Sequence, residues 1–190
     1  MKKIILWLII IFLLILFQSC QKLSNVGLKE NEIKILLENL IPRGIKIHDL
    51  MRFSIEYSPI NKINMYNNDY CEVINGYSNT NEIKNELKSV FTEKIVEKEF
   101  NNYFNSSNGV GPKFIDFEGK LYINMEFGDY GGQIVWLVKE MMIIQQNKEI
   151  IVLKIPVYYI AYEGSEKNIE IRELTLKKEN ETWKLDSIVY

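Results

Sequence analysis

The residue types that most often carry nucleophilic or metal chemistry are scarce in this chain. It contains one histidine, His48, and two cysteines, Cys20 and Cys71. A Cys–His nucleophilic pair could only be Cys71 with His48, and neither lies in the glycine-rich or helix-starting context that exposes and activates a thiolate. Cys71 lies in a semi-apolar stretch typical of a strand, so we expect it to fill core space. The sequence also lacks the several Cys or His ligands of structural zinc, a Gly-Lys-Ser/Thr phosphate loop and a Gly-x-Ser-x-Gly elbow.

Paired carboxylates are the remaining catalytic option. The nearest candidates gather around one predicted hairpin: Asp116, Glu118, Glu126 and Asp129. Two such groups can act as general acid and base. Alternating strands, however, place carboxylates on the solvent face by default, and this simpler interpretation is favoured. We therefore expect a protein that is not an enzyme.

One glycine-rich segment differs from routine turns. Gly128, Gly131 and Gly132 give the backbone unusual freedom, and Asp129 and Tyr130 between them could be presented outward. The segment is a weak phosphate cradle, because neither a helix nor a suitably placed lysine follows it. Two interpretations stay open, a plain flexible turn and a loop that inserts into a protein partner.

The N-terminus predicts export. Fourteen apolar residues from Ile4 to Phe17 follow Lys2 and Lys3 and stop shortly before Cys20. As a helix they span roughly 21 Å, which suits a signal core better than a full bilayer span. The end of this segment resembles a bacterial lipoprotein signal, although Phe17 and Gln18 are not its preferred residues. We expect residues 1–19 to be the signal peptide, Cys20 to carry the lipid and residues 20–27 to form a tether.

An uncleaved N-terminal anchor is the alternative to lipidation. Both interpretations hold the rest of the chain at the outer, extracellular face of the cell membrane. Lipidation would leave Cys71 without a disulfide partner, so the domain is expected to fold without disulfide, metal or cofactor.

Composition excludes a nucleic-acid partner. Cleavage before Cys20 removes Lys2 and Lys3 and leaves 171 residues with 21 Lys and Arg against 25 Asp and Glu. Acidic and basic residues interleave rather than forming a basic face. A chain of this length suits one domain over residues 28–190.

The periodicity predicts helices first and strands afterwards. A helix is expected from Leu28 to just before Pro42, with a further, weaker helical pattern over 45–57. Residues 58–68 read as a connection before a strand at 70–75. The segment Asn79–Glu82 resembles a capping box that opens a helix, and Thr92 is placed to cap the next one.

From residue 113 onward the pattern is that of strands, expected at 113–117, 120–126, 134–144, 149–160, 168–177 and 181–189. Pro156 places its strand at a local sheet edge or a bulge. The apolar parity changes between Ile171 and Leu174, which predicts a β-bulge near Arg172 and Glu173. The expected fold is α+β, with a helical part over 28–105 packed on an antiparallel meander over 113–190.

From Tyr70 to Tyr190 the order of features resembles the secreted DL-endopeptidase inhibitor family, proteins that restrain cell-wall peptidases of bacteria. The resemblance is carried by Tyr70–Val73, Glu86–Glu97, Glu118–Tyr122, Gly128–Gly132, Lys154–Val157 and Trp183–Asp186. It implies binding to papain-like peptidoglycan hydrolases and blockage of their active-site groove. The partner-binding residues would be Gly128, Asp129, Tyr130, Gly131 and Gly132. The N-terminal anchor departs from the family pattern and suggests action near the membrane.

A second fold family is compatible with the C-terminal strand of this sequence. Endings of the Trp-Lys-hydrophobic-Asp type also occur in cystatin-like cone folds, in which a helix lies in the mouth of a curved sheet. Such a lipoprotein would bind a small ligand or a cell-envelope protein, with a pocket lined by Trp136, Tyr158 and Trp183. The two interpretations differ in whether these aromatic side chains surround a cavity or pack into a core.

Overall fold

The computed structural model describes residues 27–52, 55–106, 111–126, 133–160 and 168–190. The described chain is α+β, and its sheets are antiparallel. The helical elements are α2 (Glu30–Arg52), α3 (Thr80–Val90), α4 (Glu93–Ile95), the π-helical η1 (Val96–Phe100) and the 3₁₀ turns η2 (Asn101–Tyr103) and η3 (Val138–Glu140). The strands are β1 (Tyr57–Met65), β2 (Asn68–Val73), β3 (Phe114–Phe117), β4 (Lys120–Asn124), β5 (Gln133–Trp136), β6 (Met142–Gln146), β7 (Ile150–Ile160), β8 (Ile169–Glu179) and β9 (Thr182–Leu185).

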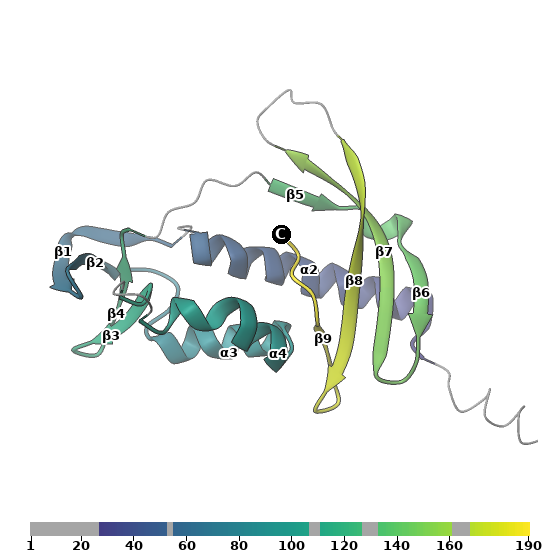
Figure 1. Cartoon of the computed structure of the whole chain (residues 1–190), viewed down its shortest axis with the longest axis horizontal. Coiled ribbons are helices and arrows are strands. Elements are labelled where there is room, and N and C mark those ends of the chain that lie inside the picture. The colour runs from purple at the N-terminus through teal and green to yellow at the C-terminus, as the bar shows by residue number, and fades with distance from the viewer. Residues whose placement is uncertain (1–26, 53–54, 107–110, 127–132, 161–167) are drawn as a thin grey trace, which may run out of the picture.

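The strands form two sheets rather than one meander. The first sheet has the order β1-β2-β4-β3, and the second has the order β5-β7-β8-β9 with β6 also paired to β7. The first sheet lies at one end of the molecule, and α2 runs from it toward β6 with α3 alongside (Figure 1). The prediction of helices before strands is therefore only partly correct, because β1 and β2 come between α2 and α3. The expected connection over 58–68 is wrong, since residues 57–65 form β1.

Helix α2 passes through Pro42, where the sequence pattern predicted a break. A proline inside a helix removes one backbone hydrogen bond and costs about 3 kcal/mol. Burial on both sides of the proline offsets this cost, because Leu37 and Ile41 before it and Ile47 and Leu50 after it are buried. The weaker helical pattern that begins at residue 45 is the second half of the same helix.

The capping prediction for α3 is confirmed. The Asn79 side chain accepts a hydrogen bond from the Glu82 N–H at 3.0 Å, and the Glu82 carboxylate reaches back to the Ser78 N–H at 2.7 Å. Thr92 occupies the N-cap position of α4 as expected, but its side chain makes no cap bond there. Its hydroxyl donates instead to Asp186 at 2.5 Å, so it fastens the helix junction to the chain after β9.

The predicted bulge in β8 is wrong. The pairing of β7 with β8 runs without a shift from Ile150 opposite Lys177 to Tyr158 opposite Ile169. The parity change arises because Ile169 and Ile171 point to the outer face of the sheet, where they are 64% and 61% exposed. The irregularity lies instead in β6, between Ile143 and Gln145.

The interpretation of Pro156 as a local edge is confirmed. The segment predicted as one strand over 134–144 is divided into β5 and β6 by η3, and both strands pair with the same edge of β7. Pro156 lies between the two paired stretches, and its carbonyl accepts from the Leu137 N–H at 2.9 Å. The nitrogen of Pro156 therefore faces the gap between β5 and β6, where the pairing with the edge strands needs no N–H donor.

The C-terminal segment is held in the centre of the molecule. The Trp136 indole donates to the Val189 carbonyl at 2.9 Å, and Arg172 donates to the Tyr190 carbonyl at 3.1 Å. The Tyr190 ring stacks on His48 with centroids 3.5 Å apart. These contacts join the second sheet, the chain end and α2.

Gly44 is the position in α2 that lies against the C-terminal segment. A Cβ added there would lie 2.6 Å from Cγ2 of Val189 and 3.1 Å from Cδ1 of Leu185. Gly→Ala in a helix ordinarily stabilises by about 0.5–1 kcal/mol. We expect Gly44→Ala to destabilise by about 1–3 kcal/mol instead, because the added methyl displaces packed side chains. Denaturant unfolding measures this, with the exposed Asn85→Ala in α3 as a control that should be neutral or stabilising. A more stable Gly44→Ala protein would contradict the packing at this point.

Candidate functional site

An apolar groove between α2 and the edge of the second sheet is a candidate for partner contact. One wall is the face of α2 that carries Leu37, Ile41 and Ile45 at four-residue spacing, which places them on one side of a helix. The other wall is β5 and η3. The groove has a volume of about 520 Å³ and is lined by Leu37, Glu38, Ile41, Pro42, Ile45, Ile134, Val135, Trp136, Leu137, Val138, Lys139 and Glu140.

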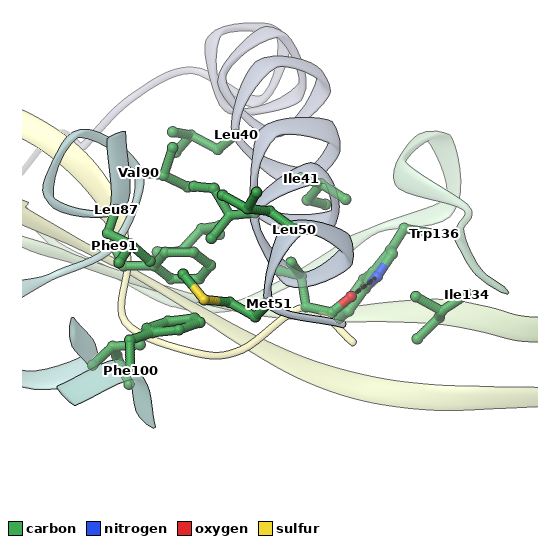
Figure 2. Close-up of a cluster of buried hydrophobic side chains, with 14 of the residues drawn as sticks. Leu40, Ile41, Leu50, Met51, Leu87, Val90, Phe91, Phe100, Ile134 and Trp136 are labelled. Carbon is green, nitrogen blue, oxygen red and sulfur yellow. Dashed lines mark hydrogen bonds between the residues drawn. The ribbon is translucent and has the colours of Figure 1, made fainter. Parts of the chain in front are cut away.

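The charged residues of this groove are few and mixed. Among its lining residues only Glu38, Lys139 and Glu140 carry charge, while nine are apolar. Trp136 is 9% exposed and packs on the side of α2 away from Phe91 and Phe100 (Figure 2). The arrangement suits an inserted apolar side chain better than a charged or phosphorylated ligand.

The three aromatic residues expected to share a pocket do not line one groove. Trp136 borders the groove beside α2, whereas Tyr158 pairs with the exposed Ile169 on the outer face of the sheet. Trp183 lies in β9 opposite Lys178. The pocket expected for a cone fold, lined by all three, does not appear among the grooves of the described chain.

A larger and more polar depression lies on the other side of α2. It has a volume of about 900 Å³ and is lined by Pro42, Ile45, Lys46, Asp49, Leu50, Ile55, Glu56, Asn75, Gly76, Tyr77 and Glu86. Several of its polar groups already have protein partners. Asn75 donates to Glu56 at 2.6 Å, and Arg43 donates to Glu86 at 3.1 Å. The two depressions share Pro42 and Ile45, which form a ridge of α2 between them.

The residues predicted to contact a partner, Gly128, Asp129, Tyr130, Gly131 and Gly132, lie outside the described residues. So does the predicted lipid-attachment residue Cys20. The chain is described again from Gln133, the first residue of β5, and the next residue, Ile134, lines the apolar groove. The glycine-rich segment is therefore covalently joined to one wall of the groove.

Cys71 and His48, the one possible Cys–His pair, each make contacts within the fold. Cys71 lies in β2, paired with Lys62 on one side and Ile123 on the other, and is 1% exposed. Burial raises the pKa of its thiol, which opposes thiolate formation. His48 is in α2, where its ring stacks on Tyr190. The expectation that Cys71 fills core space is confirmed.

The carboxylate cluster also has structural contacts. Asp116 accepts from the Thr80 N–H at 2.8 Å and from its hydroxyl at 2.6 Å, which ties β3 to the start of α3. Glu118 sits at positive φ in the turn between β3 and β4, and Glu126 is exposed after β4.

Sequence reasoning missed a buried lysine beside the end of α2. Lys113 is fully buried, and its ammonium donates to the carbonyl of Met51 in the last turn of the helix. The rings of Tyr103 and Phe114 lie within 5.8 Å of the same nitrogen. Burial lowers the pKa of Lys113 to about 8. Nothing in the Gly111-Pro112-Lys113 sequence distinguishes this lysine from a surface one.

Of the helices in the described ranges, none has the length and apolar character needed to cross a bilayer. The same ranges hold no group of three or more His, Cys, Asp and Glu side chains placed to bind a metal ion. A scan against protein-family models and a search of curated proteins found no match to this chain.

Proposed function

We propose that this chain is an exported bacterial protein, held at the outer face of the cell membrane, that binds a cell-wall DL-endopeptidase and inhibits it by blocking the active-site groove. The observation that carries the proposal is the apolar groove between α2 and β5. Strand β5, which forms one wall of this groove, directly follows the Gly128–Gly132 segment in the chain. An apolar depression next to a segment bearing an acidic and an aromatic residue suits contact with a protein.

The proposed mode is occupation of the enzyme's substrate groove. The family resemblance implies papain-like enzymes that cleave stem peptides bearing free carboxylates. Asp129 would take the place of a substrate carboxylate, and Tyr130 would fill an apolar subsite. The groove beside α2 would receive an apolar side chain from the rim of the peptidase. Such inhibition requires no bond making or breaking by this chain.

Binding is favoured over catalysis by the contacts of the reactive side chains. Cys71 is buried with a raised thiol pKa, His48 stacks on the C-terminal tyrosine, and Asp116 caps a helix through Thr80. Each of these residues makes contacts that support the fold.

A small-ligand lipoprotein of the cone type is the second candidate. It is favoured by α2, which packs against β9 and η3 of the second sheet, and by Trp136 on the wall of the groove. The apolar groove would then hold a ligand instead of a protein side chain.

Tyr130→Ala is expected to weaken inhibition about thirtyfold, which corresponds to about 2 kcal/mol for a buried aromatic contact. If Tyr130 contacts only the rim, the loss stays below about 1 kcal/mol. The measurement is an inhibition titration against purified DL-endopeptidases with wild type, Asp129→Ala and Tyr130→Ala. Ile60→Ala is the control, because this side chain is 88% exposed on β1, in the other sheet.

All four proteins must show the same unfolding midpoint before potencies are compared. Equal potency of all four would remove the Gly128–Gly132 segment from the mechanism. Absence of inhibition by wild type against every such enzyme would contradict the proposal and favour the small-ligand candidate.

A further inference from the structure

Three consecutive residues of β6 are apolar and exposed, and we call them the apolar strip. Met142 and Ile143 lie on opposite faces of the sheet, because they pair with Lys154 and Leu153. Met142, Ile143 and Ile144 are 48%, 39% and 53% exposed. Among the described residues β6 pairs only with β7, so the strip lies at an edge of the sheet. Contiguous apolar residues on a sheet edge favour association with another surface and are usually avoided where no such surface exists. The strip is separate from the groove proposed to contact the peptidase, whose lining ends at Glu140.

The first described residues, Gly27 and Leu28, contact the same strand. The Gln146 side-chain amide donates to the Leu28 carbonyl at 2.7 Å. Gly27 lies against this side chain so closely that a Cβ on Gly27 would stand 2.2 Å from the Gln146 amide nitrogen. The first turn of α2 accordingly lies beside β6 at one end of the molecule, and the first sheet lies at the other end (Figure 1).

The length of the tether limits how far this end can be from the anchor. Gly27 is seven residue steps after Cys20, and this stretch reaches about 25 Å at most when fully extended. Met142 is four residues from Gln146 along β6, or about 13 Å. Gly27 contacts Gln146, so the distance from the end of the tether to Met142 is shorter than the fully extended tether. The strip can therefore reach the membrane to which Cys20 is anchored.

We propose that Met142, Ile143 and Ile144 rest in the interface of the bilayer to which the chain is anchored. The domain is then oriented with β6 toward the lipid and the first sheet away from it. This inference rests on the export and anchoring part of the proposed function and is independent of the peptidase.

Charge around the strip indicates what kind of surface it meets. Lys154 lies opposite Met142 and is itself opposite Glu173, while Lys139 is followed by Glu140 and Lys148 by Glu149. This balance gives no basic patch for anionic lipid, so binding comes from apolar burial at the interface. We expect the contact to change little with salt.

The chain suits a site-specific probe. Its cysteines are Cys20, which the lipid would occupy, and the buried Cys71. In the full-length anchored protein, Ile144→Cys is labelled with an environment-sensitive fluorophore, and Ile60→Cys on β1 is the matched control. In phosphatidylethanolamine–phosphatidylglycerol vesicles we expect blue-shifted emission at position 144, quenched by nitroxide-labelled lipid, and unquenched emission at position 60.

Each other outcome overturns the inference at an identifiable step. Equal lipid quenching at positions 144 and 60, or no quenching at either position in anchored protein, would contradict the proposed contact of the strip with the membrane. Neither result would contradict the anchor. A blue shift at 144 that grows with protein density without lipid quenching assigns the strip to a second copy of the chain. Wild type in the aqueous phase of a detergent partition shows that the anchor itself fails, and Cys20→Ser gives the reference for that phase.

Discussion

Phe91→Ala is expected to lower the free energy of unfolding by about 3–5 kcal/mol, the range for removing a buried aromatic ring. Phe91 is fully buried and ends α3, where its N–H donates to the Leu87 carbonyl at 2.8 Å. Its ring packs on Phe100 with centroids 5.2 Å apart. Its backbone forms the isolated parallel bridge to Leu185 of β9.

The large effect follows from the number of elements that meet at this ring. A Cβ on Gly44 of α2 would lie 3.3 Å from its Cζ, so the ring contacts α2 as well as η1, while the backbone of Phe91 pairs with β9. Figure 2 shows Phe91 in the cluster that joins the α2 side chains Leu40 and Met51 to the helix junction. Removing the ring leaves a cavity between elements that cannot all close on it.

Urea unfolding of the wild type and Phe91→Ala measures the change, with the slope against denaturant compared to detect altered compactness. Ile60→Ala is the control and should change stability by no more than about 0.5 kcal/mol. A loss below about 1 kcal/mol for Phe91→Ala would mean that the junction is not packed as described.

The second large effect is a dependence of stability on pH that comes from Lys113. Burial holds its folded-state pKa at about 8, against 10.5 in the unfolded chain. Between these values the unfolded state binds a proton that the folded state does not, so stability rises with pH. The gain is about 1.4 kcal/mol per pH unit and on the order of 3 kcal/mol over the whole window. Below about pH 8 Lys113 is protonated in both states, and burying its charge destabilises the folded state by the full amount.

The measurement must isolate this lysine, because burial raises the pKa of Tyr70, Tyr77 and Cys71 and these groups act in the opposite direction at alkaline pH. Lys113→Met keeps the length of the side chain and removes the titrating group. The stability of wild type minus that of Lys113→Met should increase by about 3 kcal/mol from pH 7.5 to 10.5. A constant difference over that window would show that the ammonium is not desolvated.

Features set by neighbouring residues could be predicted from the sequence. The cap of α3 depends on Asn79 and Glu82, three residues apart, and the structure has it. Pro156 identified a local sheet edge because its lack of an N–H applies in any fold. The strand predicted at 70–75 is β2, at residues 68–73, and the long strands β7 and β8 lie where composition and turn residues predicted them.

The sequence-based predictions were wrong where a tertiary contact outweighed a local sequence rule. Pro42 reads as a helix end, but α2 continues because burial of its later residues outweighs one lost hydrogen bond. The change of apolar parity between Ile171 and Leu174 predicts a bulge that β8 does not have, because Ile169 and Ile171 lie exposed on the outer face of the sheet. Thr92 was read as a cap, but Asp186, 94 residues away, takes its hydroxyl.

The sequence by itself determined the α+β class, because this class depends on residue types and short-range spacing. The export signal and the lack of a catalytic constellation stay predictions from residue types. Only the tertiary structure decided that the strands divide into two sheets, that a groove opens beside β5, that Lys113 is buried, and that β6 adjoins the first described residues. These features depend on which distant segments meet. Pairing partners and burial follow from the packing of the whole chain, which no local pattern records.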